Sequence, residues 1–308
     1  MRMIIDTDTA SDDAVALAMA LNHSEVDVVA ITTVVGNCSL EDTTRNALYT
    51  AELCGSDVPV YAGADRPLLV KVGLATWFHG MDGLGDQGYP PPSRSAEDAD
   101  GVGALITHIR DNPGSTLVTL GPLTNLALAL VQAPDLVDLV GRCVVMGGTA
   151  NTVGNVTPAA EFNLWFDPHA ARIVFASGLP IEMVGWEICR GEASLDATER
   201  AALRALDTPL AHFFLDCNST AIEASRKQSG TVRLQLPDPT AMAAAIDKDG
   251  VVTHSSSHYV EVEAESPLTR GMSVVDSLDV TGNPANVEVV NAIDTARFKE
   301  MIFDAARG

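Results

Sequence analysis

The chain has 308 residues, 46% of them hydrophobic, and a formal net charge of −22 at neutral pH. The length suits one large domain or two small ones, and the apolar fraction is high enough to bury a substantial core. The negative charge argues against a nucleic-acid or membrane partner and favours a small neutral or cationic substrate. Because the sequence contains no linker, repeat or low-complexity segment, we predict a single domain over residues 1–308.

The first predicted element is a short buried strand, since Met3, Ile4 and Ile5 form an apolar run. The segment from Ala14 to Leu21 contains strong helix formers and almost no polar residue, so we predict a helix there. Ser11 precedes this segment and is expected to cap the helix.

Four aspartates, Asp6, Asp8, Asp12 and Asp13, crowd the turn between this strand and this helix. The helix dipole favours negative charge in the first turn, which accounts for Asp12 and Asp13 but not for the other two. Asp6 and Asp8 alternate at the strand end and are expected to point the same way. Carboxylates this close repel each other unless a cation lies between them, and Ca²⁺ or Mg²⁺ is the usual ion. The turn therefore predicts a metal site, with a purely structural cluster as the alternative.

Apolar β-rich runs alternate with helical stretches along the rest of the chain. The predicted strands lie within residues 26–37, 116–130, 139–151 and 179–188, and predicted helices include residues 43–55 and 167–178. This alternation predicts an α/β fold with a mostly parallel, Rossmann-like central sheet flanked by helices on both faces. In such sheets the ligand site lies at the carboxyl ends of the strands.

The residues that follow the predicted strands are unusually polar or small. After the aspartates come Asn37 behind the second run, Leu120 and Gly121 in the third, and Met146 with two glycines in the fourth. We expect these residues to line the site.

Five cysteines, an odd number with no CxxC pair, predict reduced and mostly buried thiols rather than a disulfide framework or a zinc site. The first predicted strand begins at residue 3, which leaves no room for a signal peptide, and no apolar run reaches membrane-spanning length. A cytoplasmic location is therefore expected.

Seven segments in order resemble the nucleoside hydrolases of the inosine-uridine preferring type. They are DTDTASDDA, ITTVVGN, HGMDGLG, LGPLTNLA, VVMGG, AEFNLWFDPHAA and LPDPTAMA, and the resemblance continues through GMSVVD and RFKEMIFDAA near the end. These enzymes are calcium-dependent N-ribohydrolases that split a ribonucleoside into ribose and free base. The resemblance implies this activity for the chain, a role in purine or pyrimidine salvage, and a homodimer or homotetramer.

The resemblance also implies a role for each matching residue. Ca²⁺ is expected to be held by Asp8, Asp13, Asp238 and the backbone carbonyl of Leu120, and Asp8 is expected to take the proton of a calcium-bound water. The positions that match ribose-binding residues are Asp12, Asn37, Asn155, Glu161 and Asn163, with Met146 against the sugar ring and Asp6 as a supporting aspartate.

Each of these residues also has a structural interpretation. Asn37 and Asn155 are typical turn residues, Glu161 and Asn163 suit a helix start, and Asp238 before a proline suits a turn or an N-cap. Their joint occurrence in family order favours the functional interpretation.

The base-binding side departs from the family pattern. Members that protonate the base through a histidine carry it immediately before the late calcium-binding aspartate, and purine-selective members carry a tryptophan there, whereas this chain has Pro237. His79 matches a second histidine near the base and is the candidate for a base contact or an acid, with a structural histidine as the alternative. Trp77, Trp165 and Trp186 are candidate stacking partners, and Trp77 stands in a Gly-rich loop beside His79. The sequence does not name the base.

Two other functions remain open at this stage. The start IIDTDT also resembles a haloacid-dehalogenase-type phosphatase, for which Lys248 is the nearest candidate for the required downstream lysine. Pro237 leaves room for a calcium-dependent nucleoside or sugar binder without turnover, or for a hydrolase of an unusual N-riboside.

Overall fold

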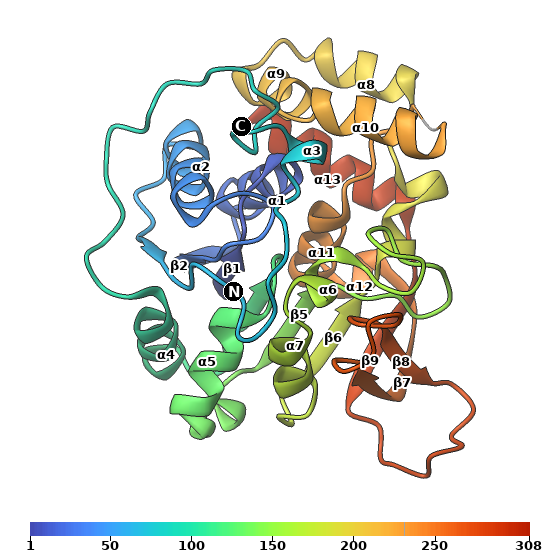
Figure 1. Cartoon of the computed structure of the whole chain (residues 1–308). Helices are drawn as coiled ribbons and strands as arrows, with labels where there is room; N and C mark the ends of the chain where they lie inside the picture. The colour runs from blue at the N-terminus through green and yellow to red at the C-terminus, as the bar shows by residue number, and fades with distance from the viewer. Residues whose placement is uncertain (231) are drawn as a thin grey trace.

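The computed structural model describes residues 1–230 and 232–308, and its centre is one sheet of nine strands in the order β3-β2-β1-β4-β5-β6-β9-β7-β8 (Figure 1). The first seven strands in this order run parallel, while β7 is antiparallel to both β9 and β8. The strands are β1 Arg2–Thr7, β2 Asp27–Thr33, β3 Val60–Ala62, β4 Thr116–Thr119, β5 Arg142–Met146, β6 Ile181–Val184, β7 Val252–Val262, β8 Ser273–Asp276 and β9 Val287–Ile293.

Helices cover both faces of the sheet, as the sequence predicts for an α/β fold (Figure 1). One face is covered by α1 Ser11–Leu21, α2 Leu40–Leu53, α9 Pro209–Asp216, α11 Pro237–Ile246 and α13 Thr295–Arg307, and the other by α4 Gly101–Asp111, α5 Thr124–Gln132 and α7 Pro168–Phe175. The remaining helices are α3 Thr76–His79, α6 Phe162–Phe166, α8 Ala197–Arg204, α10 Ser219–Ser229 and α12 Lys248–Val251, with short 3₁₀ turns at Pro134–Asp138, Trp186–Cys189 and Gly191–Ala193.

The strand order reverses direction at β1. From β1 the chain builds outward through β2 and β3, and it then crosses back to add β4 on the other side. Asp6 of β1 is consequently flanked by Thr32 of β2 and Thr119 of β4. Loops diverge on opposite sides of such a reversal, and the crevice between them is the ordinary ligand site of a parallel sheet.

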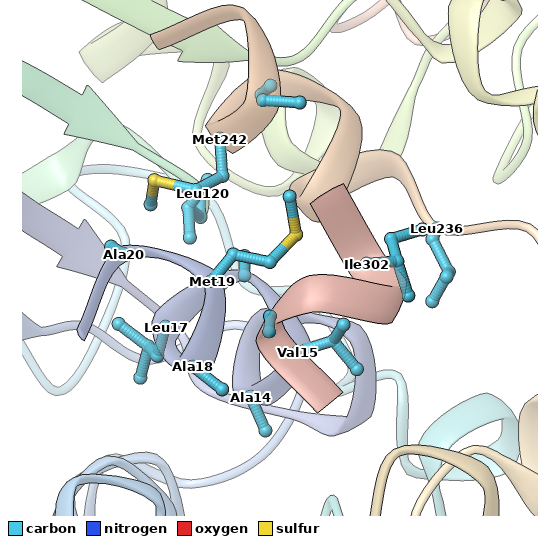
Figure 2. Close-up of a cluster of buried hydrophobic side chains, with 14 of the residues drawn as sticks. Ala14, Val15, Leu17, Ala18, Met19, Ala20, Leu120, Leu236, Met242 and Ile302 are labelled. Atoms are coloured by element: carbon cyan, nitrogen blue, oxygen red, sulfur yellow. The ribbon is translucent and has the colours of Figure 1, made fainter. Parts of the chain in front are cut away.

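Helix α1 is buried along almost its whole length and packs against α11 and α13 (Figure 2). Met19 of α1 extends toward α11, where Met242 also lies, while Ala14 and Ala18 point to the opposite side of α1 (Figure 2). Methionine suits this position because its flexible chain fills irregular gaps. The packing fixes the N-termini of α1 and α11 relative to each other.

Two details differ from the sequence prediction. The N-cap of α1 is Ala10 and not Ser11, because the Asp13 carboxylate accepts the Ala10 N–H at 2.9 Å and so closes the first turn itself. The antiparallel strands β7 and β8 lie outside the predicted pattern, since much of β7 is polar and half-exposed instead of continuously apolar.

All five cysteines are free thiols, and four of them are buried, which agrees with the prediction of reduced thiols. Within residues 1–230 and 232–308, every helix is too short or too polar to cross a membrane.

Asp167 joins three segments on the face covered by α4, α5 and α7. It is fully buried and accepts hydrogen bonds from the Leu68 N–H at 2.8 Å, the Thr124 hydroxyl at 2.8 Å and the Ala170 N–H at 3.1 Å. We expect Asp167→Ala to lower the free energy of unfolding by about 2–4 kcal/mol, because a cap is lost and buried donors lose their acceptor. Urea denaturation followed by circular dichroism measures this, with Asp167→Asn as the variant that keeps one acceptor oxygen. A loss below about 1 kcal/mol is the size expected of a surface change and contradicts this role.

Candidate active site

A cavity of about 240 Å³ opens at the carboxyl ends of the central strands. Its wall combines the turn after β1, helix α3, the 153–163 segment and the starts of α10 and α11. The residues predicted from the sequence that line it are Asp12, Asn37, Trp77, His79, Leu120, Met146, Asn155, Glu161, Asn163 and Asp238. Segments distant in the sequence therefore meet where the strand order reverses.

Three buried carboxylates form a compact group at this cavity. Asp12 and Asp13 lie in the first turn of α1, Asp238 lies in the first turn of α11, and one oxygen of each falls within 4.8 Å of the others. The sequence prediction placed Asp13 and Asp238 on the metal, and the structure brings them together. It also brings Asp12, which the prediction assigned to the sugar, into the same group.

Asp8, also predicted as a metal ligand, lies outside this group of three, in a cradle made largely of backbone. Its Oδ2 accepts the Asn37 N–H at 2.7 Å, while its buried Oδ1 has no hydrogen-bond partner among the described residues. A Cβ added to Gly36 lies 2.1 Å from Oδ2, and one added to Gly121 lies 2.5 Å from Oδ1. Only glycine leaves the Asp8 carboxylate in this place.

The burial of these carboxylates makes their negative charge costly. Desolvation, followed by the repulsion of neighbouring aspartates, raises the pKa of Asp8 and Asp238 well above the usual range and that of Asp12 to about 7. Burial also raises the pKa of Asp13, although the Thr7 hydroxyl at 2.6 Å and the Ala10 N–H oppose this. A divalent cation removes such a penalty, and the all-oxygen donor set fits a hard ion. The residues present therefore fit a metal.

Asn163 organises the carbonyl groups at the cavity floor. Its Nδ2 donates to the Leu120 carbonyl at 2.6 Å and to the Met146 carbonyl at 3.2 Å. The Leu120 oxygen retains a second lone pair, so this hydrogen bond is compatible with a metal ligand role.

Glu161 is at once a helix cap and a cavity residue. Its Oε1 accepts the Asn163 N–H at 2.9 Å, and its Oε2 accepts the N–H of Gly148 at 3.0 Å and of Leu164 at 3.3 Å. Burial raises its pKa to about 7, while these hydrogen bonds oppose the rise. Glu161 therefore caps α6, as its structural interpretation predicts, and it also lines the cavity.

The two asparagines from loops are placed by backbone hydrogen bonds. Asn37 follows β2, donates its N–H to Asp8, and approaches Asp13 Oδ2 with its Nδ2 at 3.3 Å. The Oδ1 of Asn155 accepts the Phe162 N–H at 2.9 Å, which ties the 153–163 segment to the start of α6.

His79 ends helix α3 and is buried against the turn after β1. Its Nδ1 lies 2.8 Å from the Ser11 hydroxyl oxygen and 3.7 Å from Asp12 Oδ1. Desolvation lowers the pKa of His79 to about 3, so the imidazole is neutral. Trp77, two residues earlier in α3, is 57% exposed at the cavity rim.

Asp6 lies one layer below the cavity. Its Oδ1 accepts hydrogen bonds from the Thr32 hydroxyl at 2.5 Å and from Asn125 Nδ2 at 2.7 Å. Burial raises its pKa to about 6, opposed by these two hydrogen bonds. Asp6 therefore links β1 to β2 and α5 beneath the cluster.

Part of the cavity wall comes from residues that the sequence does not single out. Arg190, Asn218, Ser225 and Gln235 line the cavity but carry no local pattern that distinguishes them from surface residues. Of the three tryptophans, Trp77 and Trp186 line the cavity, whereas Trp165 packs under the Arg270 guanidinium, 4.6 Å from its ring centroid.

Comparison with known proteins assigns almost the whole chain to one family. Residues 3–300 match the family model described as inosine-uridine preferring nucleoside hydrolase. The chain belongs to this family. It is 35% identical over 308 residues to RihB of Escherichia coli, a pyrimidine-specific ribonucleoside hydrolase, a match that covers 100% of this chain and 97% of the relative.

Solved structures of nucleoside hydrolases also match this chain over its full length. A plant nucleoside hydrolase, the PpNRh1 enzyme, matches with a TM-score of 0.93 and 31% identity over 100% of this chain and 99% of the other. A purine-preferring ribonucleoside hydrolase from Gardnerella vaginalis matches with a TM-score of 0.92 and 31% identity, over 100% and 98% of the two chains. Membership confirms the predicted fold class and the predicted activity, the hydrolysis of ribonucleosides to ribose and free base.

The phosphatase hypothesis is not supported in this nucleoside hydrolase. Lys248 begins α12 and contacts Glu288 at 2.8 Å and Glu182 at 3.2 Å. It follows the C-terminal end of α11, whereas Asp238 lies at the N-terminal end of the same helix. Lys248 therefore lies away from the aspartate cluster, whereas a phosphatase site needs the lysine beside its aspartates.

The glycine cradle gives a prediction for metal binding. We expect Gly36→Ala to displace the Asp8 carboxylate and to weaken divalent-metal affinity by about 10- to 100-fold, the range seen when supporting groups of a metal site are altered. Isothermal titration calorimetry measures this. Gly73→Ala is the matched control, because a Cβ there meets nothing within 4 Å. Equal affinity of the two variants contradicts the proposed cradle.

Proposed function

We propose that this protein hydrolyses the N-glycosidic bond of ribonucleosides with a Ca²⁺ ion held by Asp8, Asp13, Asp238 and the Leu120 carbonyl. The observation that carries this proposal is the group of buried carboxylates at the floor of a cavity whose other polar residues suit a ribose. Calcium is favoured over a softer metal because every donor is an oxygen.

Asp8 is proposed as the base of the reaction. A Ca²⁺ ion in this site supplies positive charge that lowers the pKa of a nearby water. Calcium is a weaker Lewis acid than zinc, so a carboxylate is still needed to accept the proton of the attacking water. Asp8 suits this task because its Oδ2 is held by Asn37 while its Oδ1 has no partner among the described residues.

The sugar is proposed to bind between Asp12, Asn37, Asn155, Glu161 and Asn163, with Met146 against the ring. Each ribose hydroxyl both donates and accepts a hydrogen bond, and carboxylates and amides offer the complementary groups. All six residues line one cavity. Asp6 is proposed to support the β1 end of the site through its bonds to Thr32 and Asn125.

The electrostatics of the cavity favour the transition state over the substrate. Positive charge develops on the ribose as the bond to the base lengthens, as in other glycoside hydrolyses. Carboxylates fixed around the sugar stabilise this charge more than they stabilise the neutral nucleoside.

The departing base gains negative charge and needs a hydrogen-bond donor or a proton. Pro237 supplies neither, so His79 is proposed as the base contact, acting as a neutral donor since its imidazole is buried. Trp77 is proposed to cover the base from the rim of the cavity.

The base itself is left open in this proposal. RihB is pyrimidine-specific by name and the Gardnerella enzyme purine-preferring, and both are similar to this chain over their full length. We also propose a single-domain, cytoplasmic protein that assembles as a homodimer or homotetramer.

The proposed function predicts calcium-dependent release of ribose. A reducing-sugar assay on a panel of purine and pyrimidine ribonucleosides is expected to show release with calcium and loss of release after chelation. Asp8→Asn is expected to lower kcat by on the order of 10³-fold or more, because the base is lost and a charged ligand of the metal becomes a neutral amide.

Asp98→Asn is the matched control, since Asp98 is exposed and lies outside the cavity. Substantial turnover by Asp8→Asn overturns the assignment of Asp8. If no nucleoside releases ribose while calcium still binds tightly, the chain is a binder or acts on an unusual N-riboside.

His79 gives a separate prediction on the leaving group. His79→Ala is expected to lower kcat on natural nucleosides by on the order of 100-fold, the scale for one lost donor, and to leave 4-nitrophenyl riboside almost unaffected because that leaving group needs no donor. Steady-state kinetics on both substrates measure this, with exposed His254→Ala as the control. An equal loss on both substrates argues against a role for His79 at the base.

A further inference from the structure

We infer that Ser11 is a positioning residue that fixes His79 in the tautomer carrying its proton on Nε2, so that a hydrogen-bond donor is presented to the departing base. This inference rests on the proposed function, because it assumes that the base lies beside His79. It assigns a task to a residue that the sequence analysis expected only to cap a helix.

The contact between the two residues is short and buried. Ser11 Oγ lies 2.8 Å from His79 Nδ1, Ser11 is fully buried, and His79 is 7% exposed. His79 lines the cavity while its Nδ1 is taken up by Ser11. Ser11 therefore determines whether Nδ1 carries a proton, which leaves Nε2 as the ring nitrogen available to a ligand.

The direction of this hydrogen bond follows from the partners available. Nδ1 is the one partner of the Ser11 hydroxyl among the hydrogen bonds of the described residues. If Nδ1 carried the proton, the Ser11 hydrogen would be buried without an acceptor, at a cost of about 1–3 kcal/mol. If Ser11 donates to Nδ1, the hydroxyl hydrogen is satisfied and the ring proton sits on Nε2.

Asp12 favours the opposite tautomer of His79. Its Oδ1 lies 3.7 Å from His79 Nδ1 and has no hydrogen-bond partner among the described residues. A carboxylate in this place attracts a proton to Nδ1 and so favours the opposite tautomer. By occupying Nδ1 as a donor, Ser11 counteracts that attraction.

The local backbone leaves Ser11 available for this task. Asp13 caps α1 through the Ala10 N–H, so the Ser11 hydroxyl is not used by its own helix. The Ser11 carbonyl also accepts the Asn218 Nδ2 hydrogen at 3.1 Å, which ties the start of α1 to α10. Ser11 is thus held from both sides.

The consequence concerns the bases that the enzyme accepts. An Nε2–H donor interacts with a leaving base that offers a carbonyl oxygen or an unprotonated ring nitrogen, and it stabilises the negative charge that forms there. In the other tautomer Nε2 is an acceptor and repels the same atom. Ser11 therefore acts on the rate of natural nucleosides through His79, without touching the base.

The test combines ¹⁵N NMR of the histidines with kinetics on the calcium-loaded protein. Two-bond ¹⁵N–¹H correlations distinguish the tautomers, and His79 is assigned by its loss in His79→Ala. We expect the Nε2–H form in the natural protein and the Nδ1–H form or a mixture in Ser11→Ala. Ser11→Thr, which keeps the hydroxyl, is expected to restore the Nε2–H form.

Ser11→Ala is further expected to lower kcat on natural nucleosides by about 10-fold or more, while turnover of 4-nitrophenyl riboside is retained. Ser115→Ala is the matched control, because Ser115 is a buried serine at the opposite end of the sheet.

An Nδ1–H tautomer of His79 in the natural protein overturns the inference, even if Ser11→Ala fails to fold. An unchanged tautomer in Ser11→Ala, or an equal loss on both substrates, also overturns it. Failure of the proposed function is distinct, because neither substrate is then cleaved by the natural protein.

Discussion

The arrangement of the site depends on keeping four carboxylates buried in one small volume. Asp8, Asp12, Asp13 and Asp238 repel one another, and burial adds a desolvation cost to each of their charges. The fold opposes this repulsion with fixed donors, and a cation among the carboxylates would oppose it further. The geometry that makes the group costly in isolation is therefore a geometry that fits a metal ion.

The fold supplies two kinds of opposition to this repulsion. Backbone N–H groups of Asn37 and Ala10 point at Asp8 and Asp13, and the N-termini of α1 and α11 direct the positive ends of their dipoles toward the cluster. Helices α1 and α11 pack against each other through Met19, Met242 and small residues (Figure 2). This packing opposes the separation of the two helix N-termini that the repulsion between their aspartates favours. Core packing thus fixes the distance between Asp13 and Asp238, which are far apart in the sequence.

The sequence places several cavity residues at the carboxyl edge of the sheet, for a physical reason. Asn37 and Leu120 follow buried strands and Asp238 opens a helix, so strand and helix periodicity locates them there, while their roles toward metal and sugar stay predictions. The rest of the wall is different. Asn218 and Ser225 reach the cavity through long-range packing of α10 against α3, and Gln235 lies outside any helix just before α11, so no local pattern records these contacts. The antiparallel strands β7 and β8 escaped prediction because their alternation of polar and apolar residues is irregular.

The wrong prediction of Ser11 as the cap of α1 shows how two parts of the cavity wall are joined. A serine before a helix satisfies free N–H groups in most proteins, but here Asp13 already accepts the Ala10 N–H while belonging to the carboxylate cluster. That leaves the Ser11 hydroxyl free to bond to His79. The first turn of α1 therefore serves two parts of the cavity wall, because Asp13 belongs to the carboxylate cluster and Ser11 bonds to His79.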